Sequence, residues 1–399
     1  MSVWALAGLW VGLALVATVL SIWLRIATAL SEIVVGTVAQ LVIGAAIGST
    51  ALGTNESWIK FLAGTGAIVL TFLAGAELDP KVFKLRWKDA TLIGLVGFFS
   101  PFLGCTAIAY FVLGWTGPES WLAGVALSTT SVAVVYAVML ELGLNVTEFG
   151  KAVLAACFIN DLGTVIALGL IFSPFTYRTG IFVAASVVAF TVLPWLIPRF
   201  FARYGNRPSE LETKLLLLVL FGMGALATWA DSEPVLPAYV VGMVLAGTVG
   251  KDHSLVRRLR TLTFGLLTPF YFIRAGSFVS VPALVAAPGV VLALFFAKMV
   301  TKTAGVYPAT KVSRYPPLEA KYTTLLMSTG LTFGSISALF GLTHGIIDEA
   351  QYSYLIAAVI GSAVIPTLIA NAFFVPRHLL APPAGGKETQ DVHQTARRV

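Results

Sequence analysis

The sequence predicts an all-α polytopic membrane protein with thirteen transmembrane helices. Of its 399 residues, 57% are hydrophobic and 11% are charged, and the mean hydropathy is +0.88. A soluble globular protein carries about a quarter charged residues, so that class is excluded. The apolar residues also gather into segments close to the ~20 residues that an α-helix needs to cross the hydrocarbon layer.

The thirteen apolar segments predict the orientation of the chain. Of the 26 Lys and Arg residues, 21 lie in the odd-numbered connections, at the segment ends beside them, or after the last segment. Cytoplasmic connections are rich in Lys and Arg, so we expect the N-terminus outside and the C-terminus in the cytoplasm. The formal charge of +7 follows from these connections and does not indicate a nucleic-acid partner. The segments are approximately 3–24, 31–51, 58–78, 90–113, 120–140, 150–173, 179–201, 213–230, 235–250, 261–280, 284–306, 320–342 and 352–375.

The two ends of the chain carry separate expectations. The first segment is followed by another long apolar segment and has no small-residue cleavage signature, which favours a retained helix over a signal peptide. The polar, Pro- and Gly-rich residues 382–399 predict a disordered cytoplasmic tail.

An internal repeat relates the two halves of the chain. TFLAGAELD (71–79) in the third segment resembles YFIRAGSFVS (271–280) in the tenth, and ALSTTSVAV (126–134) in the fifth resembles LLMSTGLTFGS (325–335) in the twelfth. Matching segments are seven apart, an odd number, so the two copies cross the membrane in opposite directions. Inverted-topology repeats of this kind are typical of secondary transporters.

The fifth and twelfth segments each contain a run of small and hydroxyl residues near mid-membrane. Hydroxyl groups satisfy freed backbone groups and allow a helix to break. Ordinary close packing of helices uses the same residue types. Because the runs occupy matching positions of the two repeats, we expect two crossed discontinuous helices beside the substrate site. The runs are Ser128, Thr129, Thr130 and Ser131, and Ser328, Thr329, Gly330, Thr332 and Gly334.

Asp161, next to Asn160, lies in the middle of the sixth segment with no basic residue nearby in sequence. An acid at that depth costs a few kcal/mol at least, and such residues face a cavity, carry a proton or bind a cation. A carboxyl group hydrogen-bonded inside a helix bundle is the simpler alternative. We interpret Asp161 as the binding site shared by a cation and a proton.

Four other charged residues are candidates for supporting roles. Lys298 and Lys302 share one face of the eleventh segment, although Lys302 is near enough to the cytoplasmic end for its side chain to extend into water. Arg274 inside the tenth segment indicates an ion pair or a dipole contact, with a functional role as the alternative. Glu77 is either a solvated helix end or part of an inner funnel.

The sequence contains no motif that indicates an enzyme or a resident metal. HExxH, a phosphate-binding glycine loop and a nucleophile paired with an intramembrane base are missing. Cys105 and Cys157 lie in apolar segments without metal-ligand spacing, and the four histidines fall in connections or the tail. We therefore expect a secondary transporter without a cofactor, apart from the transported Na⁺ or K⁺ and H⁺.

Taken together, these motifs resemble the cation/proton antiporter superfamily, specifically its monovalent cation:proton antiporter-2 branch of bacterial sodium/proton and potassium/proton exchangers. The resemblance spans the second to thirteenth segments. It rests on the order and spacing of FLAGAELDP (72–80), LSTTSVAVVYAVMLELG (127–143), FINDLG (158–163), KTAG (302–305) and STG (328–330).

The resemblance implies a homodimer in the bacterial inner membrane, built from a dimerisation domain and a six-helix core that moves like an elevator. Its implied boundaries are dimerisation helices in 1–89 and 206–282, core helices in 90–175 and 283–378, a linker helix in 176–205 and the tail in 379–399.

Carried over residue by residue, the resemblance assigns the cation-binding aspartate to Asp161 and the crossover hydroxyls to Thr129, Thr130 and Ser131. The helix lysine of the family matches Lys302 through the K-x-x-G pattern, with Lys298 as the competing assignment.

Asn160 is a departure from the resemblance. Many electrogenic members carry an acid at that position, and an Asn-Asp pair usually accompanies electroneutral exchange. Burial disfavours a charged carboxylate and a bound cation favours it, so a proton and a cation compete for Asp161. A single titrating acid predicts exchange of one H⁺ for one Na⁺, K⁺ or Li⁺, with Asn160 orienting Asp161 or supplying a carbonyl oxygen. The alternatives are a sodium-coupled organic-anion symporter on a related fold and a non-transporting sensor or channel subunit.

Overall fold

The apolar segments form the helices of the computed structural model, which describes residues 2–24, 26–48, 50–76, 86–172, 176–205, 208–250 and 252–380. Within these ranges the secondary structure is entirely helical. Eleven spans of the described residues are long and apolar enough to cross a membrane: nine are unbroken helices, and two, Gly117–Met139 and Pro317–Thr343, are interrupted. The protein is therefore an all-α, multi-pass membrane protein.

The helices follow the predicted segments closely. Their bounds are α1 (Val3–Leu24), α2 (Thr28–Ile47), α3 (Ser57–Ala76), α5 (Trp87–Phe111), α6 (Gly117–Ser128), α7 (Val132–Glu141), α8 (Glu148–Phe172), α9 (Tyr177–Tyr204), α10 (Leu211–Trp229), α11 (Val235–Leu245), α12 (His253–Leu262), α13 (Thr268–Ser277), α14 (Val281–Ala286), α15 (Pro288–Val312), α16 (Pro317–Met327), α17 (Thr332–Thr343) and α18 (Glu349–Phe373). Glu77 and the tail from residue 381 onward lie outside the described residues.

Two of the thirteen predicted segments are not among the eleven spans. Segment 235–250 forms α11, which is apolar but has only 11 residues, and turns follow it. Segment 261–280 is divided between the end of α12, the π-helical turn Thr263–Leu267 and α13. A continuous apolar run in the sequence does not reveal such a turn, because its side chains are as apolar as those of its neighbours. The count of thirteen crossings stays a prediction.

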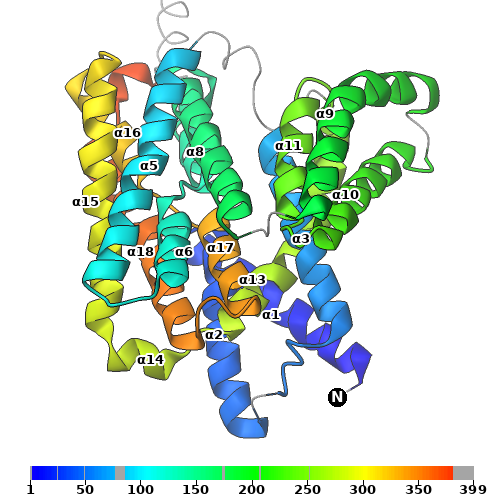
Figure 1. Ribbon diagram of the computed structural model, residues 1–399, viewed down its shortest axis with the longest axis horizontal. Helices are drawn as coiled ribbons and strands as arrows, with labels where there is room; N and C mark the ends of the chain where they lie inside the picture. The colour runs from blue at the N-terminus through cyan, green and yellow to red at the C-terminus, as the bar shows by residue number, and fades with distance from the viewer. Residues whose placement is uncertain are drawn as a thin grey trace, which may run out of the picture.

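Figure 1 shows the helices arranged in two groups. The core bundle contains α5–α8 and α15–α18, and α5 packs against α6, α8 and α15. The scaffold bundle contains α1–α3 and α9–α13, in which α3 packs on α11 and α2 on α13. The interruptions between α6 and α7 and between α16 and α17 lie inside the core bundle.

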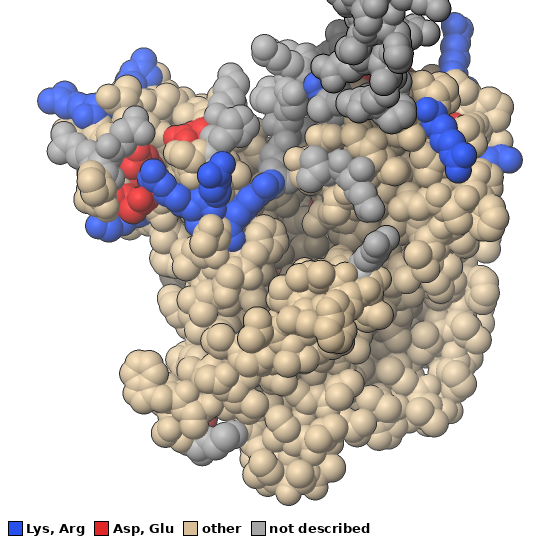
Figure 2. Space-filling view, turned by 180° about the vertical axis from the view of Figure 1, so that it is seen from behind, with Lys and Arg blue, Asp and Glu red and all other residues tan. Residues whose placement is uncertain are grey.

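Basic side chains gather at one end of the molecule. Figure 2 shows Lys and Arg along one end, with none visible on the lower half of this face. That end holds the connection between α15 and α16 (Figure 1). We call it the basic end and the other the neutral end. The distribution is the one that the alternation of basic connections along the sequence predicts.

Candidate functional site

Asn160 and Asp161 lie at the middle of α8 and are almost completely buried, with exposed fractions of 0% and 1%. The backbone N–H of Thr130 lies beside the carboxylate of Asp161. Its Oδ1 atom has no hydrogen-bond partner in the described structure. Because a buried polar atom without a partner is costly, the free oxygen is suited to bind a proton or a cation.

The backbone N–H that reaches Asp161 comes from an interruption between two helices. The polypeptide leaves α6 at Thr129 in an extended conformation (ψ 152°) and enters α7 at Val132. A second interruption separates Met327 at the end of α16 from Thr332 at the start of α17. Peptide groups at both interruptions are thus released from helical hydrogen bonds.

The two interruptions contact one another directly. The backbone N–H of Ser131 donates to the carbonyl of Thr329 at 3.1 Å. The hydroxyl of Thr130 donates to the carbonyl of Met327 at 2.7 Å. Two of the three predicted hydroxyl residues therefore link the interruptions. The hydroxyl of Thr129 instead donates to Ala126 of its own helix at 3.2 Å.

Two of the three lysines of α15, Lys298 and Lys302, are fully buried at these interruptions. Lys302 Nζ donates to the hydroxyl of Thr130 at 2.9 Å. Lys298 Nζ donates to the hydroxyl of Ser362 on α18 at 3.0 Å, and that hydroxyl also contacts the carbonyl of Gly330 at 3.3 Å. Lys302 thus contacts the interruption between α6 and α7, and Lys298 contacts the interruption between α16 and α17 through Ser362.

A cavity of about 330 Å³ connects Asp161 with the space between the two bundles. We call it the inner cavity. Its walls come from α3 (Leu73, Ala74), α7 (Val132, Tyr136) and α17 (Thr332, Phe333), and Arg260 of α12 lies on the lining. Arg260 follows Arg257 and Arg258 along α12, so the cavity lies toward the basic end. Asp161 is the acid on its lining.

Asn160 faces away from this cavity. Neither its Oδ1 nor its Nδ2 has a hydrogen-bond partner in the described structure. A Cβ atom added to Gly97 on α5 would lie 3.5 Å from Nδ2, with Val306 and Met327 beside it. Asn160 therefore makes no hydrogen bond that orients Asp161, and it borders the packing of α5 and α15.

Arg274 does not contact the carboxylate of Asp161. Its Nε donates to the carbonyl of Thr54 at 2.9 Å, and its guanidinium lies 5.0 Å from the ring centre of Phe278. These contacts belong to the neutral end.

The described residues contain no group of three or more His, Cys, Asp or Glu side chains that could hold a metal ion.

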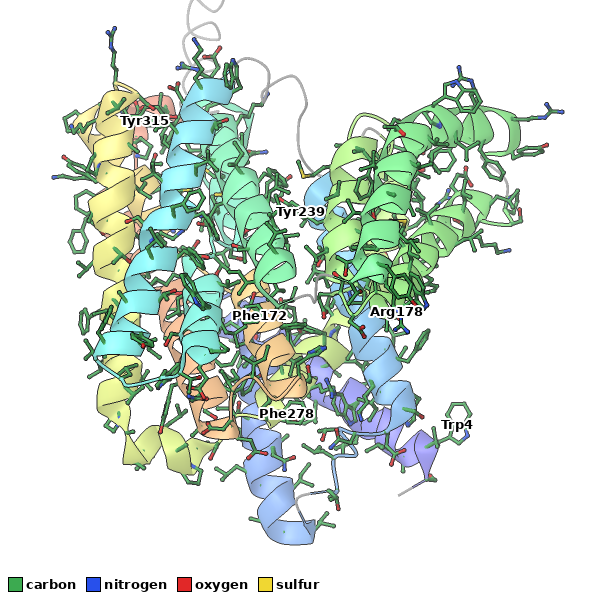
Figure 3. All side chains as sticks on the ribbon, in the orientation of Figure 1. Trp4, Phe172, Arg178, Tyr239, Phe278 and Tyr315 are labelled. Carbon is green, nitrogen blue, oxygen red and sulfur yellow. The ribbon has the colours of Figure 1, made fainter. Side chains whose placement is uncertain are left out.

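Sequence reasoning missed Ser362 and Tyr239. Tyr239 reaches from α11 toward the core bundle, donates to the carbonyl of Phe158 at 2.9 Å and meets the ring of Phe333 edge-on at 5.5 Å (Figure 3). Each lies between apolar or small neighbours in a mainly apolar helix, and only tertiary structure distinguishes it from other residues of its type.

Comparisons with known proteins identify the family. The model of the family described as the transmembrane sodium/hydrogen exchanger matches residues 11–375. A probable Na⁺/H⁺ antiporter from Methanocaldococcus jannaschii is 24% identical, covering 85% of this chain and 89% of that protein. A Na⁺/H⁺ antiporter from Enterococcus hirae is 25% identical, covering 84% and 91%. The chain spans about half the length of some other relatives, among them a cation/H⁺ antiporter of Arabidopsis thaliana.

A solved structure shares the fold. The sodium proton antiporter MjNhaP1 from Methanocaldococcus jannaschii superimposes with a TM-score of 0.67 over 92% of this chain and 95% of that one, at 15% identity. The family match extends over most of the chain, and its members are transporters, not enzymes. The chain therefore belongs to the sodium/hydrogen exchanger family and is a membrane transporter for cation and proton exchange.

Proposed function

We propose that the protein exchanges one monovalent cation, Na⁺ foremost, for one H⁺ at Asp161, without net movement of charge. The observation that carries the proposal is the buried carboxylate with one free oxygen on the lining of the inner cavity. A proton or a cation on that oxygen removes the cost of its burial, and the two compete for it. The relatives' printed names, which include Na⁺/H⁺ antiporters, support the same substrates.

The proposal of electroneutral exchange rests on the environment of Asp161. Asn160 cannot bind or release a proton, and Asp161 is the acid on the lining of the inner cavity. One titrating acid binds either one H⁺ or one cation of charge +1. Both loaded forms then carry the same charge, so the membrane potential has no net effect on their movement.

We infer that alternating access is an elevator movement of the core bundle against the scaffold bundle. Both interruptions, both lysines and Asp161 lie in the core bundle, while the far wall of the inner cavity belongs to α3 and α12. This division supports a core that carries the ion and a scaffold that forms the homodimer interface. We place the basic end in the cytoplasm of a bacterial cell, so this structure opens Asp161 to the inside.

We also propose that α6–α7 and α16–α17 are crossed discontinuous helices related by the inverted repeat, with thirteen crossings in all. The contact between residues 131 and 329 joins the two interruptions and supports this arrangement. The organic-anion symporter was the alternative, and the family match and the named relatives favour the exchanger.

Purified protein in liposomes with an internal pH dye tests the function. We expect added NaCl to move protons without any organic solute, and Asp161→Asn to abolish the signal because an amide neither releases a proton nor carries a charge. KCl and LiCl define the cation preference. Valinomycin with set K⁺ gradients imposes a membrane potential during Na⁺ exchange, and an unchanged rate is expected. Full activity of Asp161→Asn overturns the site, and a potential-dependent rate overturns the 1:1 stoichiometry.

A further inference from the structure

A second cavity, of about 170 Å³, lies between the two bundles at the neutral end. We call it the outer cavity. The same two helices, α3 and α17, line both cavities. The inner cavity is lined by Leu73 and Ala74 of α3 and by Phe333 of α17, and the outer by Gly64 of α3 and Leu339 of α17. The two cavities therefore follow one another along the boundary between the bundles.

The charged residues that line the outer cavity all lie on its scaffold side. That side carries Lys60 of α3, Glu233 of the connection between α10 and α11, and Tyr271 and Arg274 of α13. The core side is formed by α17 and is mainly apolar; its hydroxyl residue, Thr343, donates to the carbonyl of Leu339 in its own helix at 2.9 Å. The residues of α17 on the lining are Ile336, Leu339, Phe340 and Thr343.

Glu233 is fixed in position but has no ion-pair partner among the described residues. Its carbonyl accepts a hydrogen bond from Leu236 at 3.1 Å, which holds the connection against the first turn of α11. The Tyr271 hydroxyl on the same lining is buried and has no hydrogen-bond partner in the described structure. A neutral carboxyl group and a free phenol are compatible with an apolar wall, whereas a carboxylate is not.

We propose that Glu233 is a second proton site, fixed on the scaffold and facing the outside, whose protonation accompanies closure of the outer cavity by α17. The proposal rests on the elevator movement under the proposed function. Glu233 is partly buried here. When α17 withdraws, water surrounds the carboxyl group and it ionises; when α17 returns, the group takes a proton from the outside again. Because the scaffold does not carry Glu233 across the membrane, this proton adds nothing to the exchange stoichiometry.

The direction of the effect follows from burial. Burial raises the pKa of the Glu233 carboxyl to about 7 in this structure, in which α17 forms one wall of the outer cavity. A solvated glutamate has a pKa of about 4.3. Protonation of Glu233 therefore stabilises the closed state relative to the open state fully below pH ~4.3. This stabilisation is lost as the external pH rises to about 7, and above that pH the free-energy difference between the two states no longer changes. Within this window the ratio of open to closed states changes at most about tenfold per pH unit.

The other titratable or charged groups around the outer cavity are few. Lys60 and Arg274 line it, and Asp231, on the same connection as Glu233, forms an exposed ion pair at 4.0 Å with Arg178 at the start of α9. His344 follows α17 and stacks on Phe340 at 4.1 Å. Histidine is the side-chain type that changes charge between pH 5 and 8, so His344 needs its own control.

Thiol labelling from the outside tests the proposal without relying on transport. The background combines Cys105→Ala, Cys157→Ala and Asp161→Asn, which removes the native thiols and the proton of the transport site. Leu339→Cys places a reporter on the wall that α17 contributes, and Glu56→Cys in the exposed outer connection corrects for the reactivity of a thiol at each pH. A membrane-impermeant maleimide is applied at external pH 4.5 to 8 with the internal pH constant.

We expect corrected labelling of Leu339→Cys to rise severalfold between pH 4.5 and about 7 and then level off. Glu233→Gln should make it independent of pH, and Glu233→Asp should restore a dependence. Asp231→Asn, an exposed acid of the same connection, and His344→Gln should keep the original profile. A profile that Glu233→Gln leaves unchanged, or that His344→Gln removes, overturns the proposal while leaving the exchange function intact. No labelling at any pH overturns the elevator movement as well.

Discussion

At the scale of single residues, Asn160 and Asp161 differ in their surroundings although they are adjacent in sequence. Successive residues of a helix point about 100° apart, so one lines the inner cavity and the other enters the packing between α5 and α15. The Asn160 amide has unsatisfied hydrogen-bonding groups on both atoms. Such a group costs about 1–3 kcal/mol. That cost favours a function of the Asn160 amide in another conformation of the protein, in which it forms hydrogen bonds.

The residue-scale prediction concerns Asn160→Asp. The new carboxyl group is close to isosteric and adds a second titrating acid beside Asp161. We expect exchange to continue and to respond to the membrane potential, because more than one proton then exchanges per cation. The measurement is the Na⁺ gradient that exactly balances a known pH gradient, with and without an imposed potential. A balance point that the potential does not shift contradicts this expectation, and Asn160→Gln serves as the uncharged control.

At the scale of the elements, the interruptions are held by groups far apart in sequence. Thr130 of the first is bonded to Met327 of the second, and Lys302 of α15 is bonded to Thr130. The Thr130 hydroxyl therefore donates a hydrogen bond to the Met327 carbonyl and accepts one from the Lys302 ammonium at the same time. Thr129, its neighbour, bonds within its own helix.

Thr130→Val tests this difference. Valine keeps the shape of threonine but leaves the Met327 carbonyl and the Lys302 ammonium without this partner. An unsatisfied buried group costs about 1–3 kcal/mol, and more when it is charged. We expect Thr130→Val to lower the melting temperature of the detergent-solubilised protein and to reduce exchange at least tenfold, with Thr129→Val causing a smaller loss of both. Equal effects of the two substitutions contradict the assignment of Thr130 as the link.

How far the sequence predicts these elements depends on the kind of signal. Asp161 is recognisable because a charge inside an apolar segment is costly, and runs of hydroxyl residues indicate where helices can break. The choice of Thr130 over Thr129 depends on which side faces α16, 197 residues away. Ser362 resembles any serine of an apolar helix, and the orphaned Asn160 amide follows from the packing of α5. Such properties belong to tertiary contacts and leave no local pattern.

At the scale of the whole molecule, the scaffold bundle shows the relation between the two halves of the chain. The second predicted segment packs on the tenth (α2 on α13), and the third packs on the ninth (α3 on α11). Under a repeat of seven segments, each of these pairs maps onto the other. Both contacts bring glycines against the backbone of the neighbouring helix: Gly36 and Gly276 in the first pair, and Gly75 and Gly242 in the second. The equivalent packing supports the proposed inverted repeat.

The final prediction concerns the rigidity of this scaffold. A methyl group at Gly75 would collide with the carbonyl oxygen of Tyr239, a backbone atom that cannot rotate away. Overpacking of this kind costs about 1–3 kcal/mol. Gly75→Ala and Gly36→Ala should therefore both lower the melting temperature, whereas Gly222→Ala on α10, with open space around the added methyl, should leave it unchanged or raise it slightly. If only one of the two substitutions lowers the melting temperature, the two helix contacts do not contribute equally to stability. The core bundle would then move against a scaffold that is rigid at one contact and deformable at the other.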